Sequence, residues 1–96
     1  MNLRLVQFSL GPGSRSAAEA IADKIVPAIR SQQGCDRCEF FADSETGDYG
    51  LVVLWASKQA ADAAASVIGP VLRPVLADAK APHNIKLFEV YQPKTR

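Results

Sequence analysis

The chain has 96 residues, which fit one domain spanning residues 1–96. Apolar residues make up 48% of it and charged residues 22%, proportions that are typical of a globular domain and exclude a disordered one. The net charge is +1 and the longest basic cluster is Lys94-Thr95-Arg96, so the basic footprint of a nucleic-acid-binding protein is missing.

The first part of the chain is predicted to form a strand followed by a helix. Residues 3–10 have high β-propensity, and a Gly-Pro-Gly turn at residues 11–13 ends them. Ser16 and Glu19 have the spacing of a capping box, which satisfies exposed amide donors at a helix start. Apolar residues then recur at helical spacing, and Pro27 predicts a kink within the helix.

The middle of the chain is predicted to form an antiparallel hairpin. Gly34 is placed just past the helix end, and a second strand follows over residues 37–43. A short polar turn at residues 44–48 separates this strand from a third one at residues 49–55. Ser57 is then a candidate cap for the next helix.

The last part is predicted to contain a broken helix and a fourth strand. Alanine-rich residues 60–65 favour a helix, Gly69-Pro70 breaks it, and a second piece resumes over residues 71–79. Residues 83–91 form the fourth strand. The order is strand, helix, strand, strand, helix, strand, which predicts an α+β domain with a four-stranded antiparallel sheet.

The third strand is apolar on both faces, although a strand with one solvated face alternates apolar and polar residues. Two helices in this order cover only one face of a four-stranded sheet. Most soluble oligomers are symmetric assemblies of one chain, so we expect a homodimer in which a second copy covers the other face. The two faces of the strand are Tyr49, Leu51, Val53 and Trp55, and Gly50, Val52, Leu54 and Ala56.

Cys35 and Cys38 form a CxxC pair that follows a helix and enters a strand, the reverse of the thioredoxin-like order. In an extended segment their α-carbons are about 10 Å apart, beyond the reach of a disulfide. Only a turn at Asp36-Arg37 would bring them together. A zinc site would need two further ligands, and the chain has one histidine and no other cysteine. We therefore expect packing or turn residues and no metal site.

Catalytic motifs are weak. The Gly-Pro-Gly-Ser segment at residues 11–14 lacks the spacing and the lysine of a phosphate loop, and a turn before a capped helix explains it. His83, the single histidine, has a pKa range suited to a base but no recognisable partner. Trp55, at the end of the third strand, fits either a core anchor or the wall of a pocket.

Several short segments, in this order and spacing, resemble the antibiotic biosynthesis monooxygenase domain over nearly the whole chain. They are Gly34-Cys35, Phe40-Phe41-Ala42-Asp43, the hairpin, and Trp55-Ala56-Ser57-Lys58-Gln59-Ala60. The resemblance implies a ferredoxin-like fold that pairs into a dimeric α+β barrel. It also implies a cofactor-independent oxygenase that binds an apolar, quinol- or polyketide-like molecule between the sheet and the helices.

The resemblance makes Trp55 the pocket tryptophan. Polar groups near it would be Gln7, Arg73 and His83, and the candidate substrate-binding residues are Trp55, Gln7, Phe40, Leu51, Arg73 and His83. Two positions depart from the family. Ala63-Ala64-Ala65 stands where many members carry a histidine, so haem ligation is not supported, and Leu51 stands where aromatic polyketide oxygenases carry an asparagine.

Two functions are therefore open. One is a monooxygenase-like protein that needs no bound cofactor. The other is a non-catalytic ligand-binding or structural dimer of the same fold, which the apolar Leu51 and residues 63–65 favour, because such groups transfer no protons. The chain starts without a signal pattern and has no uninterrupted apolar run near ~18 residues, so a cytoplasmic protein without a membrane partner is expected.

Overall fold

The computed structural model describes residues 1–77 and 84–94. Its element order confirms the predicted strand-helix-strand-strand-helix-strand arrangement. The elements are β1 (Asn2–Ser9), α1 (Arg15–Arg30), β2 (Cys35–Asp43), β3 (Asp48–Trp55), α2 (Lys58–Ala77) and β4 (Asn84–Glu89). The strands differ from the predicted ranges by one or two residues at most of their ends, where pairing with neighbours extends or shortens them.

The four strands form one sheet in the order β2-β3-β1-β4, and every neighbouring pair is antiparallel. β1 lies between β3 and β4, with Val6 opposite both Leu51 and Ile85. Residues directly opposite one another in a ladder share a face. This register therefore decides which side chains of the four strands reach the helices.

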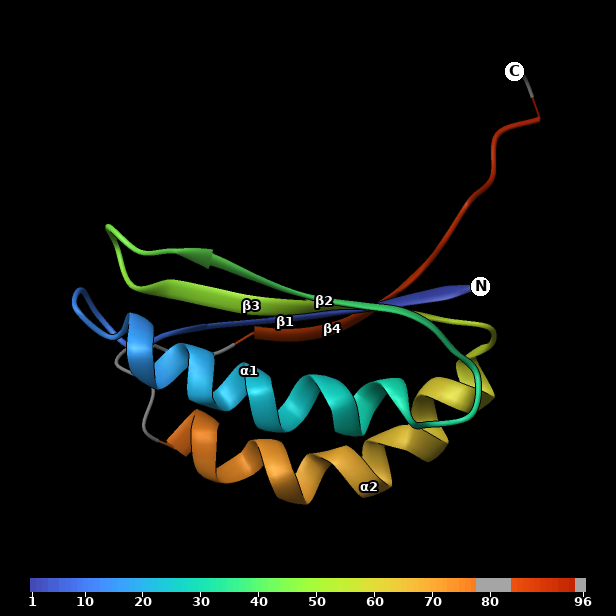
Figure 1. Ribbon diagram of the computed structural model, residues 1–96. Coiled ribbons are helices and arrows are strands. Elements are labelled where there is room, and N and C mark those ends of the chain that lie inside the picture. The colour runs from blue at the N-terminus through green and yellow to red at the C-terminus, as the bar shows by residue number, and fades with distance from the viewer. Residues whose placement is uncertain (78–83, 95–96) are drawn as a thin grey trace.

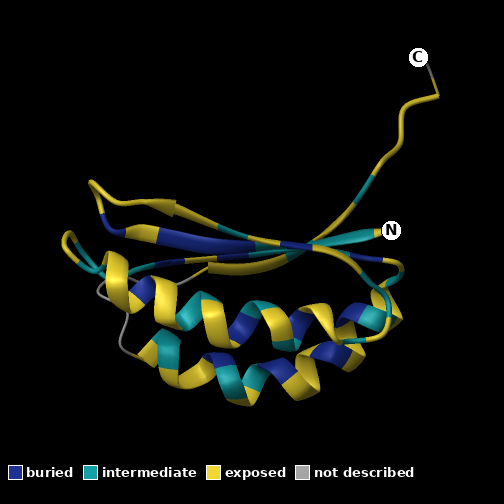
Figure 2. Ribbon diagram, in the orientation of Figure 1, coloured by how far each residue is buried: buried dark blue, intermediate teal, exposed yellow. Residues whose placement is uncertain are grey.

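Both helices lie on the same face of the sheet, and no described segment covers the other face (Figure 1). The buried residues, dark blue in Figure 2, lie where the sheet meets the helices. The core consists of the helix-facing residues of β1, β2 and β3 and the inner faces of both helices. The buried residues are Val6, Phe8, Ala18, Ile25, Ile29, Cys38, Tyr49, Leu51, Val53, Trp55, Ala61, Ala64, Ile68 and Leu72.

The start of α1 differs from the predicted capping box, and that prediction is wrong. The helix begins at Arg15 after Ser14, and no side chain caps its first turn. The Ser14 hydroxyl instead donates to the carbonyl of Leu10, 2.9 Å away. Glu19 pairs with Arg15, at 2.9 Å from Nε to Oε2, because the earlier start places the two residues one turn apart.

The predicted break at Gly69-Pro70 is also wrong, because α2 runs unbroken through Pro70 and Pro74. The ring of a proline crowds the side chain of the preceding residue, and Gly69 has no side chain to crowd. The predicted cap of this helix is confirmed, since the amide of Ala60 donates to the Ser57 hydroxyl at 3.1 Å.

α2 is long and apolar enough to cross a membrane by length and composition alone. Its alanines, valines, leucines and isoleucine give this result without any long uninterrupted apolar run. Core helices of globular domains have the same character, and α2 packs its buried residues against the sheet.

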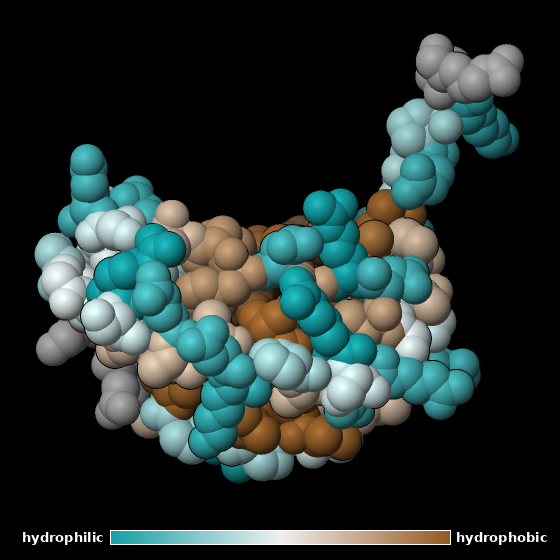
Figure 3. All heavy atoms as spheres, in the orientation of Figure 1, coloured by the Kyte–Doolittle hydropathy of each residue, from teal (hydrophilic) through white to brown (hydrophobic). Residues whose placement is uncertain are grey.

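The uncovered face of the sheet carries apolar side chains on its central strands. Leu3 and Leu5 of β1 stand opposite Leu54 and Val52 of β3, and all four are only partly buried. The aromatic ring of Phe41 lies over Gly50, where a β-carbon would collide with it. In the edge-on view of Figure 3, apolar side chains reach the surface between the loops at one end of the sheet and the C-terminal tail at the other.

Candidate functional site

A cavity of about 120 Å³ lies between the sheet and the two helices, and its walls are almost entirely apolar. Strands β1, β3 and β4 form one wall, and α2 with the end of α1 forms the other. Its lining residues are Arg4, Val6, Ile29, Leu51, Val53, Trp55, Ala64, Ala65, Ile68, Gly69, Leu72 and Ile85. Pockets with such walls bind apolar molecules and orient them with a few polar groups.

Trp55 lies at one end of this cavity, where β3 ends. Its backbone stands opposite both Asn2 and Cys35, so the ladders on either side hold it in place. The side chain is 3% exposed, and its indole N–H has no hydrogen-bond acceptor among the described residues. A buried donor without an acceptor costs free energy. The tryptophan therefore offers an unused donor beside an apolar cavity.

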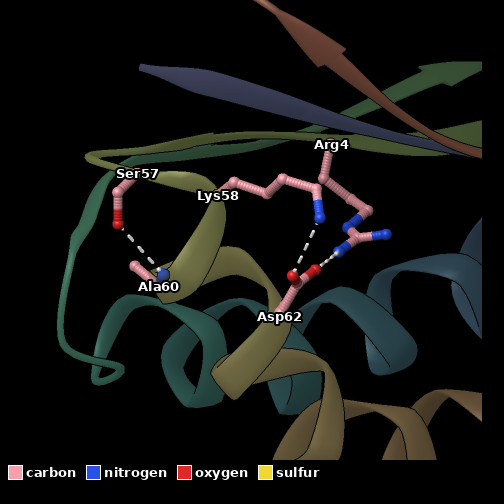
Figure 4. Close-up of polar contacts among 5 residues, drawn as sticks. All are labelled: Arg4, Ser57, Lys58, Ala60 and Asp62. Carbon is pink, nitrogen blue, oxygen red and sulfur yellow. Dashed lines mark hydrogen bonds and ion pairs between the residues drawn. The ribbon is translucent and has the colours of Figure 1, made fainter.

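Arg4 is the single charged residue among the described residues that line the cavity. It stands opposite Val53 on the helix-facing side of the sheet, in the same row as Val6 and Phe8. Figure 4 shows its guanidinium reaching toward Asp62 on α2, at 4.0 Å from Nη2 to Oδ1. The other carboxylate oxygen of Asp62 accepts from Lys58 at 3.3 Å.

The structure brings two of the sequence-predicted residues, Trp55 and Leu51, to this cavity. Phe40 also faces the helices, but it stacks on Tyr49 with ring centroids 6.1 Å apart, toward the other end of the sheet. Its neighbours there include Phe8 and the side of α1 around Pro27. Phe40 thus belongs to an aromatic cluster outside the cavity.

The polar candidates lie elsewhere. Gln7 stands opposite Gly50 on the uncovered face of the sheet, where its side-chain oxygen accepts from Asn84 at 3.5 Å. Arg73 is exposed and lines an open groove that adjoins the cavity between α2 and β4. His83 lies outside the described residues.

Arg4 is the cavity residue that sequence reasoning missed. The sequence does contain a signal for it, because alternation along the first strand places Arg4 on the same face as the apolar Val6 and Phe8. A charged residue that interrupts an otherwise buried row is a recognisable candidate for a binding site.

A bulge between Cys35 and Arg37 places the side chains of both cysteines on the same face of the sheet. Cys35 stands opposite Trp55 and Cys38 opposite Val53, two residues away on the same face of β3. Without the extra residue, positions three apart on a strand would face opposite sides of the sheet. Both thiols are free, and Arg30 donates to the carbonyl of Cys38 at 2.9 Å.

Iodoacetamide is expected to alkylate Cys35 well before Cys38 in the folded protein. Burial raises the pKa of both thiols, and that of Cys38 to about 11, while Cys38 is only 1% exposed. Because the thiolate is the nucleophile and only about one thousandth of Cys38 is thiolate at pH 8, its alkylation is slow and its rate rises with pH up to the pKa. Peptide mass spectrometry after timed alkylation measures both sites, and equal rates at neutral pH would contradict this placement.

The comparisons with known proteins agree with the fold. The family model for antibiotic biosynthesis monooxygenase matches residues 1–66, and a search of curated proteins finds no match. Among solved structures, Rv0793 from Mycobacterium tuberculosis is 18% identical, with a TM-score of 0.79 over 98% of both chains. These identities are low, so the solved structures show the fold alone.

Two further solved structures carry names that describe an activity. SnoaB, a cofactor-independent oxygenase from Streptomyces nogalater, is 15% identical with a TM-score of 0.79 over 99% of this chain and 97% of its own. The monooxygenase from the gene ActVA-Orf6 of Streptomyces coelicolor, in complex with nanaomycin D, is 19% identical with a TM-score of 0.74, over 99% and 91%. The family match covers more than half of the sequence, and the chain belongs to the antibiotic biosynthesis monooxygenase family.

Proposed function

We propose that this protein is a monooxygenase that works without a bound cofactor on a small apolar or aromatic substrate held between the sheet and the helices. The observation that carries this proposal is the apolar cavity whose lining includes Trp55, a residue with a buried indole N–H that has no acceptor among the described residues. Such a donor stabilises negative charge that develops on a substrate oxygen, and it does so most strongly in a dry cavity. The fold shared with SnoaB and the ActVA-Orf6 protein supports the same reaction class.

The reaction needs no external reductant, because the substrate supplies the electrons. The hydroxyl of a phenolic substrate loses its proton to solvent, and the ring carbon opposite it, which carries one hydrogen, adds to O₂ and the peroxide takes up a proton. The hydroperoxide that forms then loses water as its O–O bond and the C–H bond at that carbon break, which leaves a quinone carbonyl. One oxygen atom stays in the product, and the other leaves as water with the two hydrogens.

Oxygen uptake with a panel of dihydroxyaromatic compounds tests this proposal. We expect consumption above the buffer rate with at least one compound, and Trp55→Phe should lower that rate about tenfold or more, since it removes one donor to developing charge. Tyr49→Phe is the matched control. Its hydroxyl is also buried without a partner among the described residues, but Tyr49 is not part of the cavity lining. No uptake with any compound, or equal losses in both variants, would contradict an oxygenase site at Trp55.

A second candidate function is a binding protein of the same fold without catalysis. Leu51 and Ala64, which line the cavity, favour it, because neither side chain transfers protons. This function predicts that single-ring ligands change the fluorescence of Trp55, the only tryptophan, while oxygen uptake stays at the buffer rate. Oxygen uptake above the buffer rate with any dihydroxyaromatic compound of the panel would exclude this second function.

We also propose that the protein is a homodimer in which two copies pack the uncovered faces of their sheets against each other. Val52, Leu54, Leu3 and Leu5 supply the apolar centre of that face. Beyond Val90, residues 91–94 extend away from the domain, and Tyr91 is 77% exposed (Figure 1). An apolar face with an extended aromatic tail is typical of a surface that packs against a partner.

A further inference from the structure

We propose that Cys35 and Cys38 are a redox pair that closes into a disulfide within one chain, by exchange with a low-molecular-weight disulfide such as oxidised glutathione. The pair lies at the start of β2, which is an edge strand of the sheet. Both side chains lie on the helix-covered face, so they stay clear of the face that is proposed to form the dimer. This modification neither needs nor uses the proposed oxygenase reaction.

The bulge between Cys35 and Arg37 brings the two cysteines within the range of a disulfide. Cys35 stands opposite Trp55 and Cys38 opposite Val53, and these two partners are two residues apart on β3. Two residues of a strand span about 6.6 Å, so about this distance separates the α-carbons of the two cysteines. Disulfides usually join α-carbons that are about 4.4 to 6.8 Å apart. An unbulged strand would instead hold the pair about 10 Å apart and on opposite faces.

The two thiols differ in access, and this difference sets the order of the reaction. Cys35 is partly buried and borders an open hollow at the edge of the sheet, whereas Cys38 is only 1% exposed. The thiolate of Cys35 therefore attacks one sulfur of the external disulfide, which forms a mixed disulfide and releases one thiol. Cys38 then loses its proton, attacks the sulfur of Cys35 and releases the second thiol. The protein gives up two electrons and two protons, and the external disulfide becomes two thiols.

The surroundings of the pair make the exchange slow but do not favour the reduced form. Burial raises the pKa of Cys35, and burial together with the nearby Cys35 raises the pKa of Cys38 to about 11. The guanidinium of Arg30 acts on both pKa values in the opposite direction, and its Nη2 donates to the carbonyl of Cys38 at 2.9 Å. Strongly oxidising pairs have a stabilised thiolate in their reduced form, and here neither thiolate is stabilised. We therefore expect a disulfide that forms within hours rather than seconds and persists once formed.

Trypsin provides a direct test, because Arg37 lies between the two cysteines. The full chain is equilibrated with mixtures of reduced and oxidised glutathione, its free thiols are blocked with N-ethylmaleimide, and it is digested. Cleavage after Arg37 separates residues 31–37 from residues 38–58, and only a disulfide between Cys35 and Cys38 keeps these two peptides joined. In the more oxidising mixtures, we expect the joined peptides to outnumber the glutathione adduct of Cys35 about tenfold or more, because the second thiol is held in place by the fold.

Cys38→Ser and Cys35→Ser are matched variants, since each leaves one of the two thiols. Cys38→Ser should accumulate glutathione on Cys35, whereas Cys35→Ser should stay unmodified over the same time because Cys38 is buried. Equal modification of the two variants would overturn the order of attack. Cys38→Ala takes the place of Cys38→Ser if circular dichroism shows that serine at this buried position prevents folding.

The unaltered chain decides whether the disulfide forms at all. The proposal is overturned if no mixture gives the joined peptides, whether Cys35 is then found as a free thiol or as a stable glutathione adduct. It is also overturned if the joined peptides come only from disulfides between two chains, which appear as a doubled mass before reduction. Oxygen uptake plays no part in these measurements, so a failure here leaves the proposed oxygenase function standing.

Discussion

Replacing Gly47 by alanine is expected to destabilise the fold by about 3–5 kcal/mol, from left-handed backbone strain together with overpacking. Gly47 ends the β2–β3 turn with φ +79°, its amide donates to Asp43 at 2.8 Å, and its carbonyl accepts from Leu10 at 2.9 Å. A β-carbon there would collide with the backbone of Gly11. Backbone atoms cannot rotate away as a side chain can, so the two turns would have to separate.

Gly13→Ala separates the two causes. Gly13 has nearly the same φ, +83°, but a β-carbon there meets no atom within 4 Å. This variant should cost only about 1–2 kcal/mol, the strain of the left-handed backbone alone. Urea denaturation of both variants measures the difference in the free energy of unfolding. Equal losses would show that the close approach of the two turns contributes nothing.

Replacing Val52 by aspartate is expected to convert a dimer into a folded monomer. Val52 is half-buried at the centre of the uncovered sheet face, opposite Leu5 on β1 and Glu39 on β2. A carboxylate there remains hydrated in a monomer but would be buried without a partner in the proposed interface, at a cost of several kcal/mol. Sedimentation velocity at micromolar concentration measures the change, and far-UV circular dichroism checks that the variant folds.

Val67→Asp is the matched control for this experiment. Val67 lies on α2 and is 53% exposed, on the helix layer away from the uncovered face. The Val67→Asp substitution introduces the same charge as Val52→Asp and should leave the oligomeric state unchanged. The proposed dimer would be overturned if the unaltered protein sediments only as a monomer. It would also be overturned if the Val52→Asp variant still sediments as a dimer.

The sequence predicted the fold well because the strong signals are local and repeated along the chain. The apolar third strand, the hairpin turn and the Ser57 cap all depend on neighbours within a few residues. The capping box failed because the helix start was decided by contacts with the preceding loop, where Ser14 bonds Leu10. The break at Pro70 failed because Gly69 has no side chain for the proline ring to crowd, and Ile68 and Leu72 on either side are buried in the core.

The site was harder to predict than the fold. Leu51 and Trp55 lie four positions apart on β3, and because side chains alternate along a strand, alternation alone places both on the same face. Gln7 is separated from the cavity because it is odd-numbered on β1, whereas Arg4 and Val6 face the helices. Alternation identifies the two faces of each strand, but only the register between strands shows which face is covered. That register also places Arg4 diagonal to Trp55 on the helix-facing side of the sheet.

The position of β4 has a consequence for the order in which the domain assembles. β1 and β4 are direct neighbours, with Asn2 opposite Glu89, so the first strand to be synthesised pairs with the last. Until β4 is added, one edge of β1 has unpaired backbone groups, and such an edge invites pairing with other chains. Contacts between distant parts of a chain also form slowly. A nascent chain that already contains β3 and both helices would therefore be the species most exposed to aggregation, and the last strand closes that edge.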